Sequence, residues 1–148
     1  MMLCAALFAP GVSGAAVCAV SAVSLVFGAY NEFQIGHTDG TGHIAVTCHG
    51  APGELVSYTL TLNAGGGSFL QRRMQAANGS LLHYNLYTTA ARVVVWGDGS
   101  SGSAAVSDAY SLRAGAVTRS YPVYGRVFSL QKVPVGLYSD SIVVTLNH

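Results

Sequence analysis

The C-terminal stretch Gly136-Leu-Tyr-Ser-Asp-Ser-Ile-Val-Val-Thr-Leu-Asn-His148 decides the fold. Its apolar side chains recur at every second position, interrupted by Asp140: Tyr138, Ile142, Val144 and Leu146. This alternation, with β-branched residues in the middle, predicts a strand with one apolar face. No turn or further strand follows to cover its free edge, and a long apolar edge left unpaired invites aggregation. We therefore expect this strand to border a groove that another chain fills.

Composition narrows the class of protein. The 148 residues suit one domain of ordinary size, with room for a real core. Hydrophobic residues make up 51% of the chain and charged residues only 9%, against about a quarter charged in soluble globular proteins. A surface this poor in charge is typical of a protein that partners cover or that works outside the cytosol. The net charge of +1 creates no basic field, so we expect no nucleic-acid partner.

Short alternating segments separated by turn residues occupy the rest of the chain. No apolar period of 3.6 residues is sustained for three turns, which argues against helices. The Asn78-Gly79 pair predicts a hairpin turn. Together, seven or eight short strands predict an all-β sandwich. The expected strands before the terminal one are Val20–Tyr30, His43–Cys48, Leu55–Asn63, Leu81–Thr88, Arg92–Trp96, Ala105–Leu112 and Tyr121–Leu130, with Asn31–Gly42 as a polar loop.

The first 15 residues resemble the end of a secretory signal peptide. A short apolar run, Leu3–Ala9, precedes small residues at Ser13 and Ala15, so we expect cleavage after Ala15. No Lys or Arg precedes the run, which leaves a start codon farther upstream as one alternative and a buried N-terminal strand or helix as another. The run is too short to cross a membrane as a helix.

Removal of the signal would leave two cysteines, Cys18 and Cys48. A disulfide between them would close a loop of about 30 residues and stabilise the fold by roughly 3–4 kcal/mol. Two buried free thiols are the alternative. His43, Cys48 and His49 cluster in sequence, but their spacing does not match a zinc site, so we expect no metal and no cofactor.

The sequence contains no motif that predicts a catalytic site. No Gly-x-Ser-x-Gly elbow surrounds a serine, and no spacing pairs two of the six acidic residues for hydrolysis. Asp140 interrupts an apolar register and is expected to be a hydrogen-bonded structural carboxylate. Trp96 and the eight tyrosines are expected in the core, with a sugar-binding platform as the alternative. We therefore expect a protein that is not an enzyme.

Several local signatures follow one another in a specific order. They are Phe27-Gly28-x-Tyr30, Gly42-x-Ile44-x-Val46-x-Cys48, Tyr58-Thr-Leu-Thr-Leu62, Leu82-x-Tyr84-Asn-Leu-Tyr87, Val95-Trp96-Gly97-Asp98-Gly99, Val123-Tyr124-Gly125-Arg126-Val127 and Gly136-x-Tyr138-x-Asp140-x-Ile142-x-Val144-Thr145. From Cys18 to the end, this ordered set resembles the spore coat protein U domain. That family includes subunits of archaic chaperone–usher pili.

The resemblance implies an incomplete immunoglobulin-like β-sandwich that lacks its last strand, with a pilin domain at residues 16–148 after a signal peptide at residues 1–15. It also implies a disulfide between Cys18 and Cys48. A periplasmic chaperone would lend the missing strand, and an extension of a neighbouring pilin subunit would replace it at an outer-membrane usher, which is donor-strand complementation. The groove would lie between the first and terminal strands, lined by Val23, Leu25, Phe27, Ile142, Val144 and Leu146.

The function implied is that of a secreted structural subunit, periplasmic in transit and then part of a cell-surface fibre for adhesion and biofilm formation. The alternative is a tip adhesin or coat protein that binds a carbohydrate or an abiotic surface, for example around Ser68–Leu70.

Only Ala16 and Val17 would precede Cys18 after cleavage, too few for a donor strand. The chain is expected either to accept a strand without giving one or to lack its true N-terminus. Leu3–Val17 as the donor is a third alternative, which Pro10 and nearby glycines disfavour.

Overall fold

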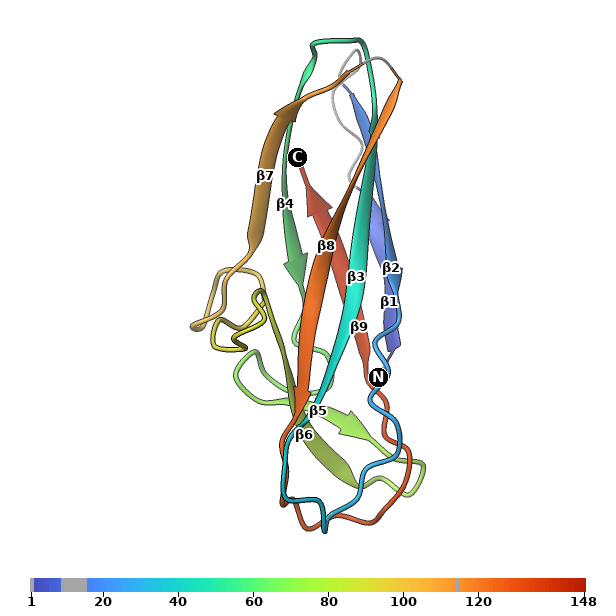
Figure 1. Cartoon of the computed structure of the whole chain (residues 1–148), viewed down its shortest axis with the longest axis vertical. Coiled ribbons are helices and arrows are strands. Elements are labelled where there is room, and N and C mark those ends of the chain that lie inside the picture. Colours follow the sequence, from blue (N-terminus) through green and yellow to red (C-terminus); the bar gives the residue numbers. More distant parts are fainter. Residues whose placement is uncertain (1, 9–15, 114) are drawn as a thin grey trace.

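The computed structural model describes residues 2–8, 16–113 and 115–148, with the backbone alone for residues 2–8, as a sandwich of two β-sheets (Figure 1). The first sheet has the order β1-β9-β4-β7, formed by Met2–Phe8, Ser141–Asn147, Leu55–Leu62 and Val106–Ser111. The second has the order β2-β3-β8-β6-β5, formed by Val17–Val23, Thr38–His49, Ala116–Val127, Leu81–Tyr87 and Arg72–Gln75. Every pairing is antiparallel except β1 with β9, which is parallel. The predicted all-β sandwich is confirmed.

Local sequence patterns predicted several elements well. β4 begins at Leu55 as predicted, and β5 and β6 pair as a hairpin around Asn78-Gly79, where Gly79 has a φ of 90°. The predicted strand Arg92–Trp96 is wrong, because Val95 and Trp96 form only isolated bridges. The described residues contain no helix long and apolar enough to span a bilayer.

The first predicted strand was misplaced. Strand β2 covers Val17–Val23, and its inward side chains are at even positions, since Cys18 is buried and pairs with Cys48 of β3. The expected polar loop Asn31–Gly42 is also too long, because β3 already begins at Thr38. After Val23, the odd-numbered residues Leu25 and Phe27 face the core. The inward side chains therefore change from even positions in β2 to odd positions in the segment that follows it.

Buried polar groups inside the sandwich satisfy one another. Arg72 of β5 is fully buried and donates to the backbone oxygens of Asn63 and Trp96 and to Oδ1 of Asn85, at 2.8, 2.7 and 2.8 Å. The indole Nε1 of Trp96, also fully buried, donates to the carbonyl oxygen of Leu60 at 3.1 Å. Burial lowers the pKa of Arg72. Trp96 is thus a core residue, and the alternative of a surface sugar platform at this position is wrong.

Candidate functional site at the edge of strand β9

Strand β9 has the apolar face that its alternation predicted. Ile142, Val144 and Leu146 have no exposed surface and point into the core, while Val143 and Thr145 are half-buried on the other face. One edge of β9 is paired antiparallel with β4. Its other edge can pair with a further strand, and this second edge is the candidate site.

The second edge of β9 is occupied by the chain's own N-terminal strand. β1 runs parallel to β9, with Leu3 opposite Ile142 and Phe8 opposite Leu146, and its register shifts between Cys4 and Leu7. Figure 1 shows β1 beside β2, close to the seam between the two sheets. The expectation that this edge is uncovered is therefore wrong for the full chain. The predicted cleavage point after Ala15 lies outside the described residues.

Two of the residues expected on the opposite side of the site lie inside the sandwich. Leu25 is fully buried and Phe27 packs against the core. Their side chains lie over Gly40 of β3 and Gly125 of β8, which face each other as Cα partners. The Phe27 ring also meets Tyr84 edge-on, with 6.3 Å between the ring centroids. Because neither glycine has a side chain, the two large side chains can pack directly against the sheet at these positions.

Val23 does not join them. Its side chain is 65% exposed, because the even-numbered parity of β2 turns it outward. Whether Val23 lines a groove for another strand stays a prediction. Whether Leu25, Phe27, Ile142, Val144 and Leu146 receive a strand from another chain stays a prediction.

Asp140 anchors the start of β9. Its Oδ2 accepts the Tyr84 hydroxyl at 2.5 Å, and its Oδ1 accepts the backbone N–H groups of Gly66 and Ser141 at 3.0 and 2.9 Å. Burial raises the pKa of Tyr84, and the hydrogen bond to Asp140 raises it further. The expected structural, hydrogen-bonded carboxylate is confirmed by these three bonds, which tie the glycine-rich loop after β4 to the candidate site.

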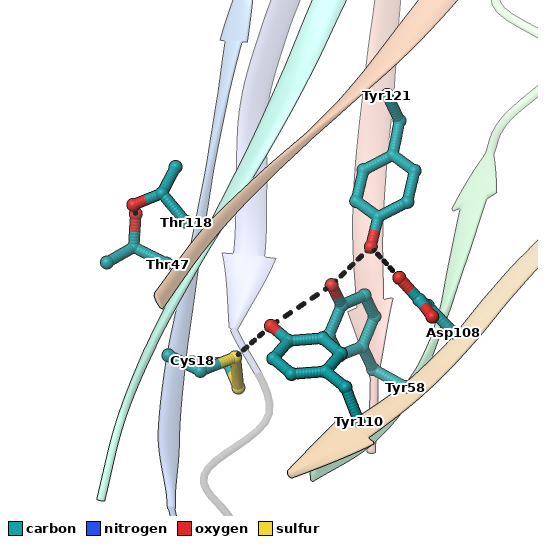
Figure 2. Close-up of a disulfide and its surroundings, with 8 residues drawn as sticks. Cys18, Thr47, Tyr58, Asp108, Tyr110, Thr118 and Tyr121 are labelled. Carbon is teal, nitrogen blue, oxygen red and sulfur yellow. Dashed lines mark hydrogen bonds between the residues drawn. A yellow bond between two sulfur atoms is a disulfide. The ribbon is translucent and has the colours of Figure 1, made fainter. Parts of the chain in front are cut away.

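The disulfide between Cys18 and Cys48 is confirmed, with an S–S distance of 2.05 Å. It joins the edge strand β2 to β3 beside the candidate site. Figure 2 shows a chain of tyrosine hydroxyls that leads away from it. Tyr110 donates to Sγ of Cys48 at 3.4 Å, and Tyr58 lies within hydrogen-bonding distance of both Tyr110 and Tyr121.

This tyrosine chain connects the two sheets, since Tyr58 and Tyr110 belong to β4 and β7 and Tyr121 belongs to β8. Burial raises the pKa of Tyr58, and burial together with a hydrogen bond to Asp108 raises the pKa of Tyr121 to about 12. The sequence treated these tyrosines only as core residues. No local signal pairs Tyr58 with Tyr110 or Tyr121, which are 52 and 63 positions away along the chain.

At Asp108 the tyrosine chain reaches the surface. Its carboxylate accepts the Tyr121 hydroxyl at 2.5 Å and the Arg119 guanidinium at 2.9 Å. Burial alone would raise the pKa of Asp108, but these two donors outweigh it and hold the pKa below its ordinary value of 3.8. Among the residues that the structure describes, no group of three His, Cys, Asp or Glu side chains is placed to hold a metal ion. The arrangement supports strand pairing at the second edge of β9.

Comparisons with known proteins agree with this architecture. The family model of the Spore Coat Protein U domain matches residues 5–145. A similar solved structure is the pre-assembly complex of the chaperone CsuC and the tip adhesion subunit CsuE from archaic chaperone–usher Csu pili of Acinetobacter baumannii. The TM-score is 0.58 at 18% identity, over 90% of this chain and 40% of that one, so the likeness concerns the fold alone. No curated protein matches the chain.

Proposed function

Because the chain belongs to the Spore Coat Protein U domain family, we propose that it is a secreted structural subunit of a cell-surface fibre, assembled by a chaperone and usher through strand exchange. The fibre would act in adhesion and biofilm formation. One observation carries this proposal. The second edge of β9 accepts β1 as a partner strand, although β1 and β9 are far apart in the sequence.

The position of β1 suggests how the site becomes available. A signal peptide that ended at Ala15 would take Met2–Phe8 with it and leave the edge of β9 without a partner. Ile142, Val144 and Leu146 would then lose part of their cover, and an open apolar edge is prone to aggregate. A periplasmic chaperone would supply the strand first, and a neighbouring subunit would supply it in the fibre. No active site is part of this proposal.

Expression of residues 16–148 in the periplasm tests the proposal. We expect this chain to aggregate alone and to become soluble when a periplasmic chaperone of an archaic chaperone–usher system is co-expressed. The full chain should unfold at a higher denaturant concentration than residues 16–148, because β1 pairs with β9. Mass spectrometry of the secreted chain should find Ala16 at its N-terminus.

A peptide in trans provides the matched comparison. A synthetic peptide with the sequence Met2–Phe8 should stabilise residues 16–148, whereas the same peptide with proline in place of both Leu3 and Cys4, which pair with β9, should not, because proline cannot donate to the ladder. A stable monomer of residues 16–148 that unfolds reversibly and ignores both peptides would contradict the proposal. So would a secreted chain that retains Met2–Phe8.

A second candidate function, that of a tip adhesin, is favoured by exposed apolar side chains on two adjacent loops. The backbones of Tyr30 and Gly136 hydrogen-bond and hold these loops together at the lower end of the molecule in Figure 1. The exposed side chains are Phe33, Ile35, Leu130, Val135 and Leu137. Apolar surface held on loop ends can adhere to an abiotic surface. Leu70, in the predicted Ser68–Leu70 region, is also exposed but lies outside this group.

Adsorption of the full chain to polystyrene separates the two functions. If the protein is a tip adhesin, Phe33→Ser with Ile35→Ser should lower the adsorbed amount several-fold, because both side chains are more than three-quarters exposed. The control is Val93→Ser with Val94→Ser, which removes exposed apolar surface from a different loop. Equal adsorption of both double variants would leave the shaft subunit as the function.

A further inference from the structure

A concavity of about 610 Å³ opens where the edge strand β5 meets the start of β9. The glycine-rich loop after β4 and the β5–β6 turn form its sides, through Gly66 and through Ala76 and Ala77. Gly66 is required for this shape, because a Cβ there would lie 3.0 Å from the carbonyl oxygen of Arg73. The concavity adjoins the edge of β9 that pairs with β1, because Ser141 lines it and is the Cα partner of Met2.

Arg73 contributes the one positive charge among the described residues that line the concavity. The side chain of its neighbour Arg72 is fully hydrogen-bonded in the core, but the side chain of Arg73 forms no hydrogen bond or ion pair with any described residue. Its Nε is buried and has no acceptor within that part of the chain. A guanidinium with free donors binds a carboxylate best, since its fork geometry allows two parallel hydrogen bonds.

The remaining polar groups favour a ligand that carries hydroxyl groups. The side chains of Gln75, Ser139 and Ser141 line the concavity, and none of them hydrogen-bonds to another residue that the structure describes. Asp140 also lines it, so the concavity contains a carboxylate as well as the Arg73 guanidinium. This opposing charge disfavours a densely charged polyanion and leaves room for a ligand with one carboxylate and several hydroxyl groups.

A peptide fits the concavity less well. The outer edge of β5 is already closed at this point, because the backbone N–H groups of Gln75 and Ser139 donate to each other's carbonyl oxygens at 2.8 and 3.0 Å. A peptide therefore has no free strand edge to extend here. Leu81 and Leu137, which are 41% and 76% exposed, offer apolar contacts at the rim that suit the C–H face of a sugar ring.

We propose that this concavity binds an acidic saccharide, with the carboxylate of a uronic acid on Arg73 and its hydroxyl groups on Gln75, Ser139 and Ser141. Such a site would let a subunit attach to acidic polysaccharide at the cell surface or in a matrix. The proposal does not depend on strand exchange, because no residue of the concavity needs to leave its place.

Titration of the full chain with tetragalacturonate, followed by NMR or calorimetry, tests the site. Binding should weaken at least about tenfold in Arg73→Ala, a loss equivalent to one bidentate contact. Arg73→Lys should recover only part of it, because an ammonium group lacks the fork. Gly66→Ser should also weaken binding, since its side chain enters the concavity. Lys132→Ala, which removes an exposed positive charge outside this lining, should bind as the unaltered chain does.

Two comparison ligands test whether the site recognises the carboxylate and whether it prefers a saccharide to a peptide. Neutral maltotetraose should bind at least about tenfold more weakly than tetragalacturonate, because it lacks the carboxylate. A tetraglutamate peptide that bound more tightly than tetragalacturonate would overturn the choice of a saccharide. Equal binding by Arg73→Ala, equal binding of maltotetraose, or no binding below about 10 mM would overturn the site. None of these outcomes would alter the strand-exchange results on residues 16–148.

Discussion

Gly40 of β3 and Gly125 of β8 are Cα partners, and the side chains of Leu25 and Phe27 lie against both of them. The contact brings the segment after β2 inside the sandwich, although that segment forms no strand. The two glycines therefore leave the space in which Leu25 and Phe27 pack inside the sandwich.

A methyl group at Gly125 should destabilise the protein. The added Cβ would lie 2.6 Å from Cζ of Phe27 and 2.9 Å from Cδ1 of Leu25. Overpacking of this kind costs about 1–3 kcal/mol, so we expect Gly125→Ala to lower the free energy of unfolding by that amount in a denaturant titration. Gly36→Ala is the control, because nothing lies within 4 Å of its Cβ. Equal midpoints for the two variants would contradict the packing described.

Arg72 and Arg73 are adjacent but should differ sharply in their effect on stability. Arg72→Ala removes the donor to the buried carbonyl oxygen of Trp96 and to the backbone oxygen of Asn63, while Oδ1 of Asn85 still accepts the N–H of Leu86. Each unsatisfied group costs about 1–3 kcal/mol, so a total loss of at least about 2 kcal/mol is expected. Arg73→Ala breaks no hydrogen bond within the described part of the chain and should change the unfolding free energy by less than about 1 kcal/mol. Similar losses in both variants would refute this distinction.

Loss of the disulfide should lower stability through the loop that it closes. The cysteines are 30 residues apart, and opening a loop of that length costs about 3–4 kcal/mol. We expect Cys18→Ala with Cys48→Ala, or a reducing agent, to lower the denaturant midpoint accordingly. A reduced protein, verified by thiol titration, that kept its midpoint would count against this prediction.

The pH dependence of stability should contain a contribution from Asp108. Its pKa is lowered in the folded state by Tyr121 and Arg119, despite partial burial, so the folded state favours the carboxylate. The contribution is fully present above the ordinary pKa of 3.8 and is lost as the pH falls through the lowered folded value. The difference in unfolding free energy between the unaltered chain and Asp108→Asn should therefore shrink in acid. A difference that stayed constant from about pH 7 to about pH 2 would show that Asp108 is not coupled to folding.

The sequence alone determined the fold class and the strands whose pattern is local. Alternation at period two identified β4 and β9, and Asn78-Gly79 identified the hairpin of β5 and β6, because both signals depend on residues close together in the chain. Parity also predicted the inward side of Ile142, Val144 and Leu146 correctly. The pairing of Cys18 with Cys48 followed from the family resemblance.

Only the tertiary structure decided which distant segments meet. The outward position of Val23 follows from the pairing of β2 with β3, and the inward turn at Leu25 follows from the glycines on β3 and β8. The pairing of β1 with β9 and the contact between Tyr58 and Tyr121 join segments far apart in the sequence. Local side-chain patterns carry no information about such partners, because strand order and sheet packing are set by the fold as a whole. For the same reason, the unpaired Arg73 became distinct from the buried Arg72 only once the chain was folded.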